Sequence, residues 1–160
     1  MKQQIITHRL SIAAAVLLIS FLTAACGSKQ PQQKSEKELM KTDSLFSRLS
    51  IEQGMQKAFL AYMDTSAVLI RQKHMPIEGV SSIKHYFEGF SDTTFILTWK
   101  PLKARLSHEN TMGFTYGIYE IAQKTTGKLT GTGTYITIWQ KDSNGHWKAI
   151  FDTGNEGLGK

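Results

Sequence analysis

The sequence predicts an α+β fold in which N-terminal helices cover one face of a curved antiparallel sheet. Two observations carry this prediction. Apolar residues recur at helical spacing before Ser91, whereas β-branched and aromatic residues dominate the runs that follow it. Turn sequences separate those later runs, and a block of helices followed by a block of strands is typical of the α+β class.

Two helical regions are expected in the first half of the chain. Asp43 or Ser44 can cap the first helix, and the sequence at 50–53, Ser-Ile-Glu-Gln, has the pattern of a capping box, so the helix is expected to break near Ser50. Apolar residues at helical spacing continue to Met63. A short strand follows at 67–71. The second helix is expected from about 80 to 88.

The second half of the chain is expected to form strands. The predicted strands cover 93–99, 101–107, 112–123, 129–141 and 146–153. Pro101 has no backbone N–H to donate, which limits its strand to a sheet edge or a bulge. The turn at 142–145, Asp-Ser-Asn-Gly, mimics the start of a calcium loop but lacks the downstream glutamate, so it is interpreted as a hairpin turn.

The N-terminus has the pattern of an export signal. Lys2 and Arg9 precede an apolar run that ends in small residues before Cys26, and that run is short for a bilayer-spanning helix. The segment resembles a bacterial lipoprotein signal, which implies cleavage after residue 25 and lipidation of Cys26. An ordinary cleaved signal and an uncleaved anchor are the alternatives. Gly27 and Ser28 favour the outer membrane, facing the periplasm, if the cell has two membranes.

The formal net charge is +6, from 19 Lys and Arg residues against 13 Asp and Glu residues. Removal of the signal with Lys2 and Arg9 leaves +4. Most of the remaining cations are scattered, so nucleic-acid binding is not expected. Residues 26–41 are polar and lysine-rich, and we expect a lipidated, flexible tether that lies near anionic headgroups.

The remainder of the chain is similar to a known superfamily over roughly residues 43–157. The matching stretches include 54–62, 64–69, 76–79, 97–101, 113–120, 133–139, 145–148 and 152–155. They resemble the nuclear-transport-factor-two-like domains, shared with ketosteroid isomerases and SnoaL-like cyclases, and most closely a bacterial subgroup without an assigned function. The resemblance implies a cone-shaped sheet wrapped around helices, a cavity at its open end and often a homodimer. The domain is therefore placed at 42–157, with a tail at 158–160.

Asp152 is the candidate catalytic residue. It follows the apolar residues 149–151 near the end of a predicted strand, and a carboxyl group at a cavity wall can act as an acid or base near neutral pH. Strict alternation places Asp152 with Lys148 and Ile150, opposite Trp147 and Phe151. The alternative is a structural aspartate that caps a turn or accepts a hydrogen bond.

Aromatic side chains are the candidate ligand-binding residues, because such rings suit a small apolar or aromatic molecule. The alternative for each is core packing. Tyr116 and Tyr119 must face opposite sides of one strand, and we expect Tyr116 to face the cavity together with Phe114 and Ile118. The candidate ligand-binding set is Trp99, Tyr116, Tyr135 and Trp139.

No cofactor or metal site is predicted. The histidines show no ligand spacing, and the Gly131-Thr132-Gly133 run leads into a strand rather than a helix, so it is not a phosphate-binding loop. Three functions stay open. They are a membrane-tethered domain that binds a small molecule, an acid–base isomerase, cyclase or dehydratase, and a dimerising assembly module without a ligand.

Overall fold

The computed structural model describes residues 29–90 and 93–159. The chain divides into two compact units, Met1–Pro31 and Gln32–Lys160. Of the first unit only residues 29–31 are described, as the first turn of a helix. The expected signal at 1–25 and its lipidation site Cys26 lie outside the described residues. In the described part of the chain, no helix is both long and apolar enough to cross a bilayer.

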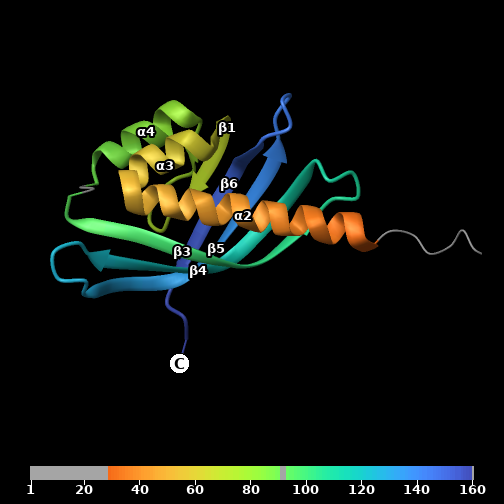
Figure 1. Cartoon of the computed structure of the whole chain (residues 1–160). Helices are drawn as coiled ribbons and strands as arrows, with labels where there is room; N and C mark the ends of the chain where they lie inside the picture. The colour runs from red at the N-terminus through yellow and green to blue at the C-terminus, as the bar shows by residue number, and fades with distance from the viewer. Residues whose placement is uncertain (1–28, 91–92, 160) are drawn as a thin grey trace, which may run out of the picture. The chain divides into compact units, whose positions relative to one another are not determined.

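Helices and strands follow one another in the order that the α+β prediction requires (Figure 1). The elements are α2 (Lys29–Gln53), α3 (Met55–Tyr62), β1 (Met63–Ile70), β2 (Ile77–Glu78), α4 (Val80–Glu88), β3 (Phe95–Leu106), β4 (Met112–Gln123), β5 (Leu129–Lys141) and β6 (Trp147–Glu156). The predicted helix at 80–88 is confirmed, and it ends at Gly89.

The strands form one curved, six-stranded sheet in the order β2-β1-β6-β5-β4-β3. All neighbours pair antiparallel except β1 and β6, which run parallel. The two strands expected around Pro101 are one strand, β3, with a register shift between Pro101 and Lys103. Because β3 is an edge strand, the prediction that Pro101 requires an edge or a bulge is confirmed.

The extent of helix α2 contradicts the expectation that residues up to 41 form a flexible tether. The expected flexible segment 26–41 is helical from Lys29 onwards, and Leu39 is completely buried in the core. The sequence 32–38 is polar because most of it covers the exposed side of the helix, and Gln, Lys and Glu are good helix formers. The folded domain therefore begins before residue 42.

The helix break lies at Gly54 rather than near Ser50. Gly54 has a φ of 92°, a conformation that glycine adopts without steric cost, and it separates α2 from α3. The hydroxyl of Ser50 does not cap a helix. It donates a hydrogen bond of 2.9 Å to the carbonyl oxygen of Leu97, which fastens α2 to β3.

The core lies between the helices and the inner face of the sheet. In Figure 1, α2 crosses the sheet while α4 packs beside β1. The ring of Phe46 in α2 contacts the rings of Phe59, Trp99 and Trp139, with centroids 4.9, 4.6 and 6.1 Å away. Further along the same face, the sheet and helices part and leave a cavity.

Candidate functional site

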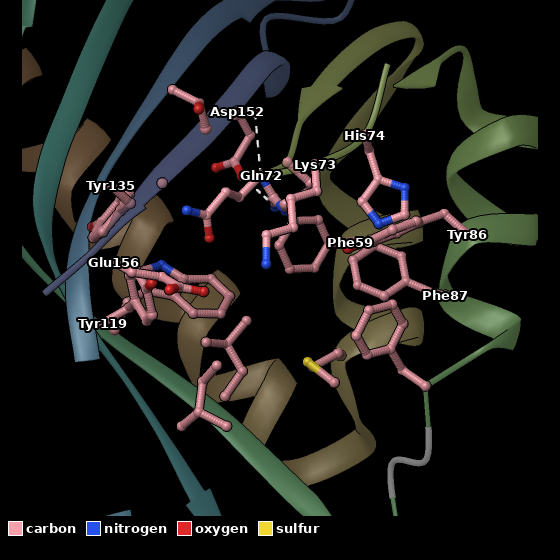
Figure 2. A pocket seen from close by; sticks show the side chains of 18 residues that line it. Phe59, Gln72, Lys73, His74, Tyr86, Phe87, Tyr119, Tyr135, Asp152 and Glu156 are labelled. Carbon is pink, nitrogen blue, oxygen red and sulfur yellow. Dashed lines mark hydrogen bonds and ion pairs between the residues drawn. The ribbon is translucent and has the colours of Figure 1, made fainter. Parts of the chain in front are cut away.

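The cavity has a volume of about 370 Å³ and is partly open to solvent. Its walls come from α3, α4, the segment after β1 and the inner face of the sheet (Figure 2). Apolar and aromatic side chains form most of the surface. They are Met55, Phe59, Tyr86, Phe87, Phe90, Leu97, Trp99, Tyr119, Ile121 and Tyr135. A cavity of this size and character suits a small organic molecule.

Glycines make room for the two tyrosines on the sheet wall. A Cβ atom on Gly133 would lie 2.6 Å from the ring of Tyr119, and one on Gly117 would lie 2.8 Å from the ring of Tyr135. Gly117 pairs with Tyr135 across the sheet, and Gly133 pairs with Tyr119. Each ring therefore lies over the glycine of the neighbouring strand, which leaves the space in front of the ring open.

Charged and polar groups gather at the other side of the cavity. Asp152 is buried, and its Oδ1 accepts a 2.7 Å bond from Nη2 of Arg71 while its Oδ2 accepts a 2.6 Å bond from Thr137. The Arg71 guanidinium lies over the Phe59 ring at 5.7 Å. With its amide nitrogen turned towards Glu156, Gln72 donates to both carboxylate oxygens at 3.1 and 3.2 Å.

A second carboxylate lies beneath the cavity wall. Asp43, in the middle of α2, is completely buried. Its Oδ1 accepts a 2.7 Å bond from the indole N–H of Trp99, and its Oδ2 accepts a 2.7 Å bond from the hydroxyl of Tyr135. Burial raises the pKa of Asp43, although these hydrogen bonds act in the opposite direction. Burial and the neighbouring Asp43 also raise the pKa of Tyr135 well above its ordinary value.

Asp43 therefore positions two of the rings that line the cavity. Sequence reasoning treated it only as a possible helix cap. The signal that could have found it is its spacing: Asp43 follows Leu39 by four residues and precedes Phe46 by three, which places it on the apolar face of the helix.

Comparison with solved structures defines the fold. A protein of unknown function from Pseudomonas putida superposes with a TM-score of 0.64 at 10% identity, over 77% of this chain and 87% of that one. A nuclear transport factor 2-like protein with a cystatin-like fold, from Novosphingobium aromaticivorans, gives a TM-score of 0.63 at 10% identity, over 93% of this chain and 90% of that one. The chain has the nuclear transport factor 2-like fold.

Chemistry does not follow from these comparisons. A ketosteroid isomerase-like protein from Erwinia carotovora atroseptica superposes on the same fold with a TM-score of 0.59 at 12% identity, over 76% of this chain and 95% of that one. Identities this low establish the fold and nothing about the reaction. No protein-family model matches the sequence, and no curated protein does.

Within this fold, three predicted residues line the cavity together: Trp99, Tyr135 and Asp152. Asp152 is on the cavity side for a reason that strict alternation misses. Across from Ile138 and Trp139 stand Phe151 and Ala149, so Ile150 is an extra residue in a β-bulge. Asp152 therefore shares the inner side with Trp147 and not with Ile150, as alternation had predicted.

Two of the predicted ligand-binding residues are elsewhere. Tyr116 lies on the opposite side of β4, 41% exposed, and Tyr119 lines the cavity in its place. The alternation between the two tyrosines is confirmed, but the side assigned to Tyr116 was wrong. Trp139 is completely buried in the core, where its indole N–H donates 2.8 Å to the Thr115 hydroxyl. It packs beneath the cavity and does not line it.

Metal-ligating side chains do not gather at one place in the described chain. Within residues 29–90 and 93–159, no cluster of three or more His, Cys, Asp or Glu side chains has the arrangement to hold a metal ion. Oδ1 of Asp142 accepts hydrogen bonds from the backbone N–H groups of Asn144 and His146, each at 2.9 Å, which confirms a hairpin turn at 142–145.

Proposed function

We propose that the domain binds a small apolar or aromatic molecule in the cavity, and that a lipid on Cys26 tethers it to a membrane. The observation that carries the first part is the cavity itself, about 370 Å³ in volume and lined mainly by aromatic and aliphatic side chains. Burial of a ligand's apolar surface there contributes roughly 25 cal/mol per Å² removed from water.

An acid–base enzyme is the alternative that the fold allows. Such an enzyme needs a carboxylate that is free to take a proton from the substrate. Both oxygens of Asp152 already accept hydrogen bonds, from Arg71 and from Thr137. The paired carboxylate is held as an acceptor, and this favours binding over catalysis.

Ligand binding is testable with a neutral fluorescent probe, N-phenyl-1-naphthylamine. We expect its fluorescence to rise on addition of the protein, and a Leu97→Trp variant to bind at least about tenfold more weakly because the larger ring fills the cavity, a difference of about 1.4 kcal/mol. Leu102→Trp is the matched control, since Leu102 is on the same strand but 53% exposed and outside this cavity.

Two results would count against binding in the cavity. One is an absence of saturable fluorescence with the unsubstituted chain. The other is equal affinity in the Leu97→Trp and Leu102→Trp variants. Thermal unfolding of both variants shows whether each one is folded during the measurement.

The proposed tether rests on Cys26 and on a basic stripe along α2. Lys34, Lys37 and Lys41 are exposed and follow one another at spacings of three and four residues, so they share one side of the helix. That side is opposite the buried Leu39 and Phe46. Juxtamembrane cations are each attracted to an anionic surface by about 1 kcal/mol. Gly27 and Ser28 after the lipidation site favour the outer membrane, with the domain facing the periplasm, if the cell has two membranes.

Lipidation predicts a specific mass change at the N-terminus. In the mature protein we expect the first peptide to begin at Cys26 and to carry diacylglyceryl and acyl groups, detected by mass spectrometry. A Cys26→Ala variant should lose these groups and any incorporated fatty-acid label, whereas Ser28→Ala should keep them. An unmodified Cys26 in the mature protein would contradict the proposed anchor.

A further inference from the structure

Contacts within the protein occupy three of the five N–H donors of the Arg71 guanidinium. Its Nη1 donates to the carbonyl oxygens of Ile70 and Asp152 at 2.9 and 3.3 Å, and its Nη2 donates to Oδ1 of Asp152 at 2.7 Å. A guanidinium carries five N–H donors in a rigid planar fork. The remaining two, on Nε and Nη2, form its other edge and meet no acceptor among residues 29–90 and 93–159.

Contacts with Asp152 and Phe59 hold the Arg71 guanidinium, and therefore its free edge, in a fixed orientation. Arg71 lines the cavity, its side chain is 22% exposed, and it lies over Phe59 while Thr137 holds the carboxylate with which it pairs. Two parallel donors at fixed spacing match the two oxygens of a carboxylate. Because the fork is already oriented, a ligand would lose little entropy in meeting it.

The neighbouring charges balance and leave the free edge of Arg71 available to an anion. Figure 2 shows the side chain of Lys73 directed into the cavity beside Phe59. No acidic side chain in the described part of the chain forms an ion pair with Lys73. The two acids on the wall are already engaged, Asp152 by Arg71 and Glu156 by Gln72. Arg71 neutralises Asp152, whereas Glu156 keeps its negative charge because Gln72 is neutral, and Lys73 offsets that charge. The preference for an anion therefore comes from the unoccupied edge of Arg71.

We infer that the ligand of this cavity is an aromatic or aliphatic carboxylic acid, with its carboxylate on the Nε–Nη2 edge of Arg71 and its apolar body among Phe59, Phe87 and Leu97. This inference rests on the proposed binding function and names its ligand class. A singly charged carboxylate fits better than a phosphate, because a dianion costs more to desolvate in a largely apolar cavity.

The test uses two probes of nearly equal shape, 1-naphthaleneacetate and its neutral amide, with binding measured by calorimetry on the full chain. We expect the acid to bind at least tenfold more tightly than the amide. In an Arg71→Lys variant the positive charge beside Asp152 stays but the planar fork is lost. The affinity for the acid should fall at least tenfold, while the affinity for the neutral amide should fall much less, because its body stays in the apolar part of the cavity and it carries no charge for the fork to bind.

Arg105→Lys is the matched control, because Arg105 forms an exposed ion pair of 3.2 Å with Glu36, and it does not line the cavity. It should change neither affinity. The inference is overturned if the acid binds no more tightly than the amide, or if neither probe binds. It is also overturned if Arg71→Lys reduces the affinities for both probes equally. The neutral N-phenyl-1-naphthylamine probe judges the proposed function separately, so the two failures are distinguishable.

Discussion

Replacement of Gly133 with alanine is expected to destabilise the domain by about 3 kcal/mol. The added Cβ would lie 2.0 Å from the carbonyl oxygen of Asn155 and 2.6 Å from the ring of Tyr119. Asn155 cannot move away easily, because it is part of the β5–β6 ladder, where it pairs with Thr134. Relief of the clash therefore requires either a bent ladder or a displaced tyrosine, and urea unfolding measures the cost of both.

Gly131 provides a matched control on the same strand. A Cβ there meets only the side chain of Ile121, at 3.4 Å, which is ordinary van der Waals contact. Gly131→Ala should be neutral or stabilising by up to about 1 kcal/mol, because alanine has less freedom in the unfolded chain. Equal free energies of unfolding for the two variants would show that the close approach of Tyr119 to Gly133 does not exist in solution.

These glycines also show why the side of β4 that faces the cavity could not be predicted from the sequence. The strands from Met112 onwards, the turn at 142–145 and the helix at 80–88 follow from local patterns, and the structure agrees with them. In contrast, β1 begins at Met63 rather than at 67, and β2 was not predicted. The side of β4 that faces the cavity depends on which residues lie across from it. Tyr119 faces Gly133 and Tyr135 faces Gly117, and both pairings are set by the register of β4 against β5. Tyr116 was therefore assigned to the wrong side.

A similar limit applies to the two carboxylates. The bulge at Ile150 reverses the alternation before Asp152, and a single extra residue in a strand leaves no clear mark in one sequence. For Asp43 the difficulty is chemical. An aspartate at the expected start of a helix is usually a cap. Its spacing to Leu39 and Phe46 marks the buried face, but its role as an acceptor depends on Trp99 and Tyr135, which reach it from distant strands.

Removal of the Asp43 carboxylate is expected to cost about 3 kcal/mol or more. An Asp43→Ala variant would leave the indole N–H of Trp99 and the hydroxyl of Tyr135 buried without their acceptor. The loss should be smaller when Tyr135→Phe is added, because one unsatisfied donor is then removed. A double-mutant cycle in urea unfolding should give a coupling of roughly 1–3 kcal/mol, and strictly additive losses would contradict a direct bond.

The pH dependence of stability separates a buried carboxylate from a merely well-packed side chain. Because burial raises the pKa of Asp43 above 3.8, the folded state binds its proton more tightly than the unfolded state does. The contribution of Asp43 to stability is therefore fully present below that unfolded value, and it is lost as the pH rises through the folded pKa. An Asp43→Asn variant has a neutral amide at this position, which does not titrate. The stability of the unsubstituted chain relative to Asp43→Asn should therefore fall from about pH 4 upwards, and a rise would mean that the charged form is the one the fold favours.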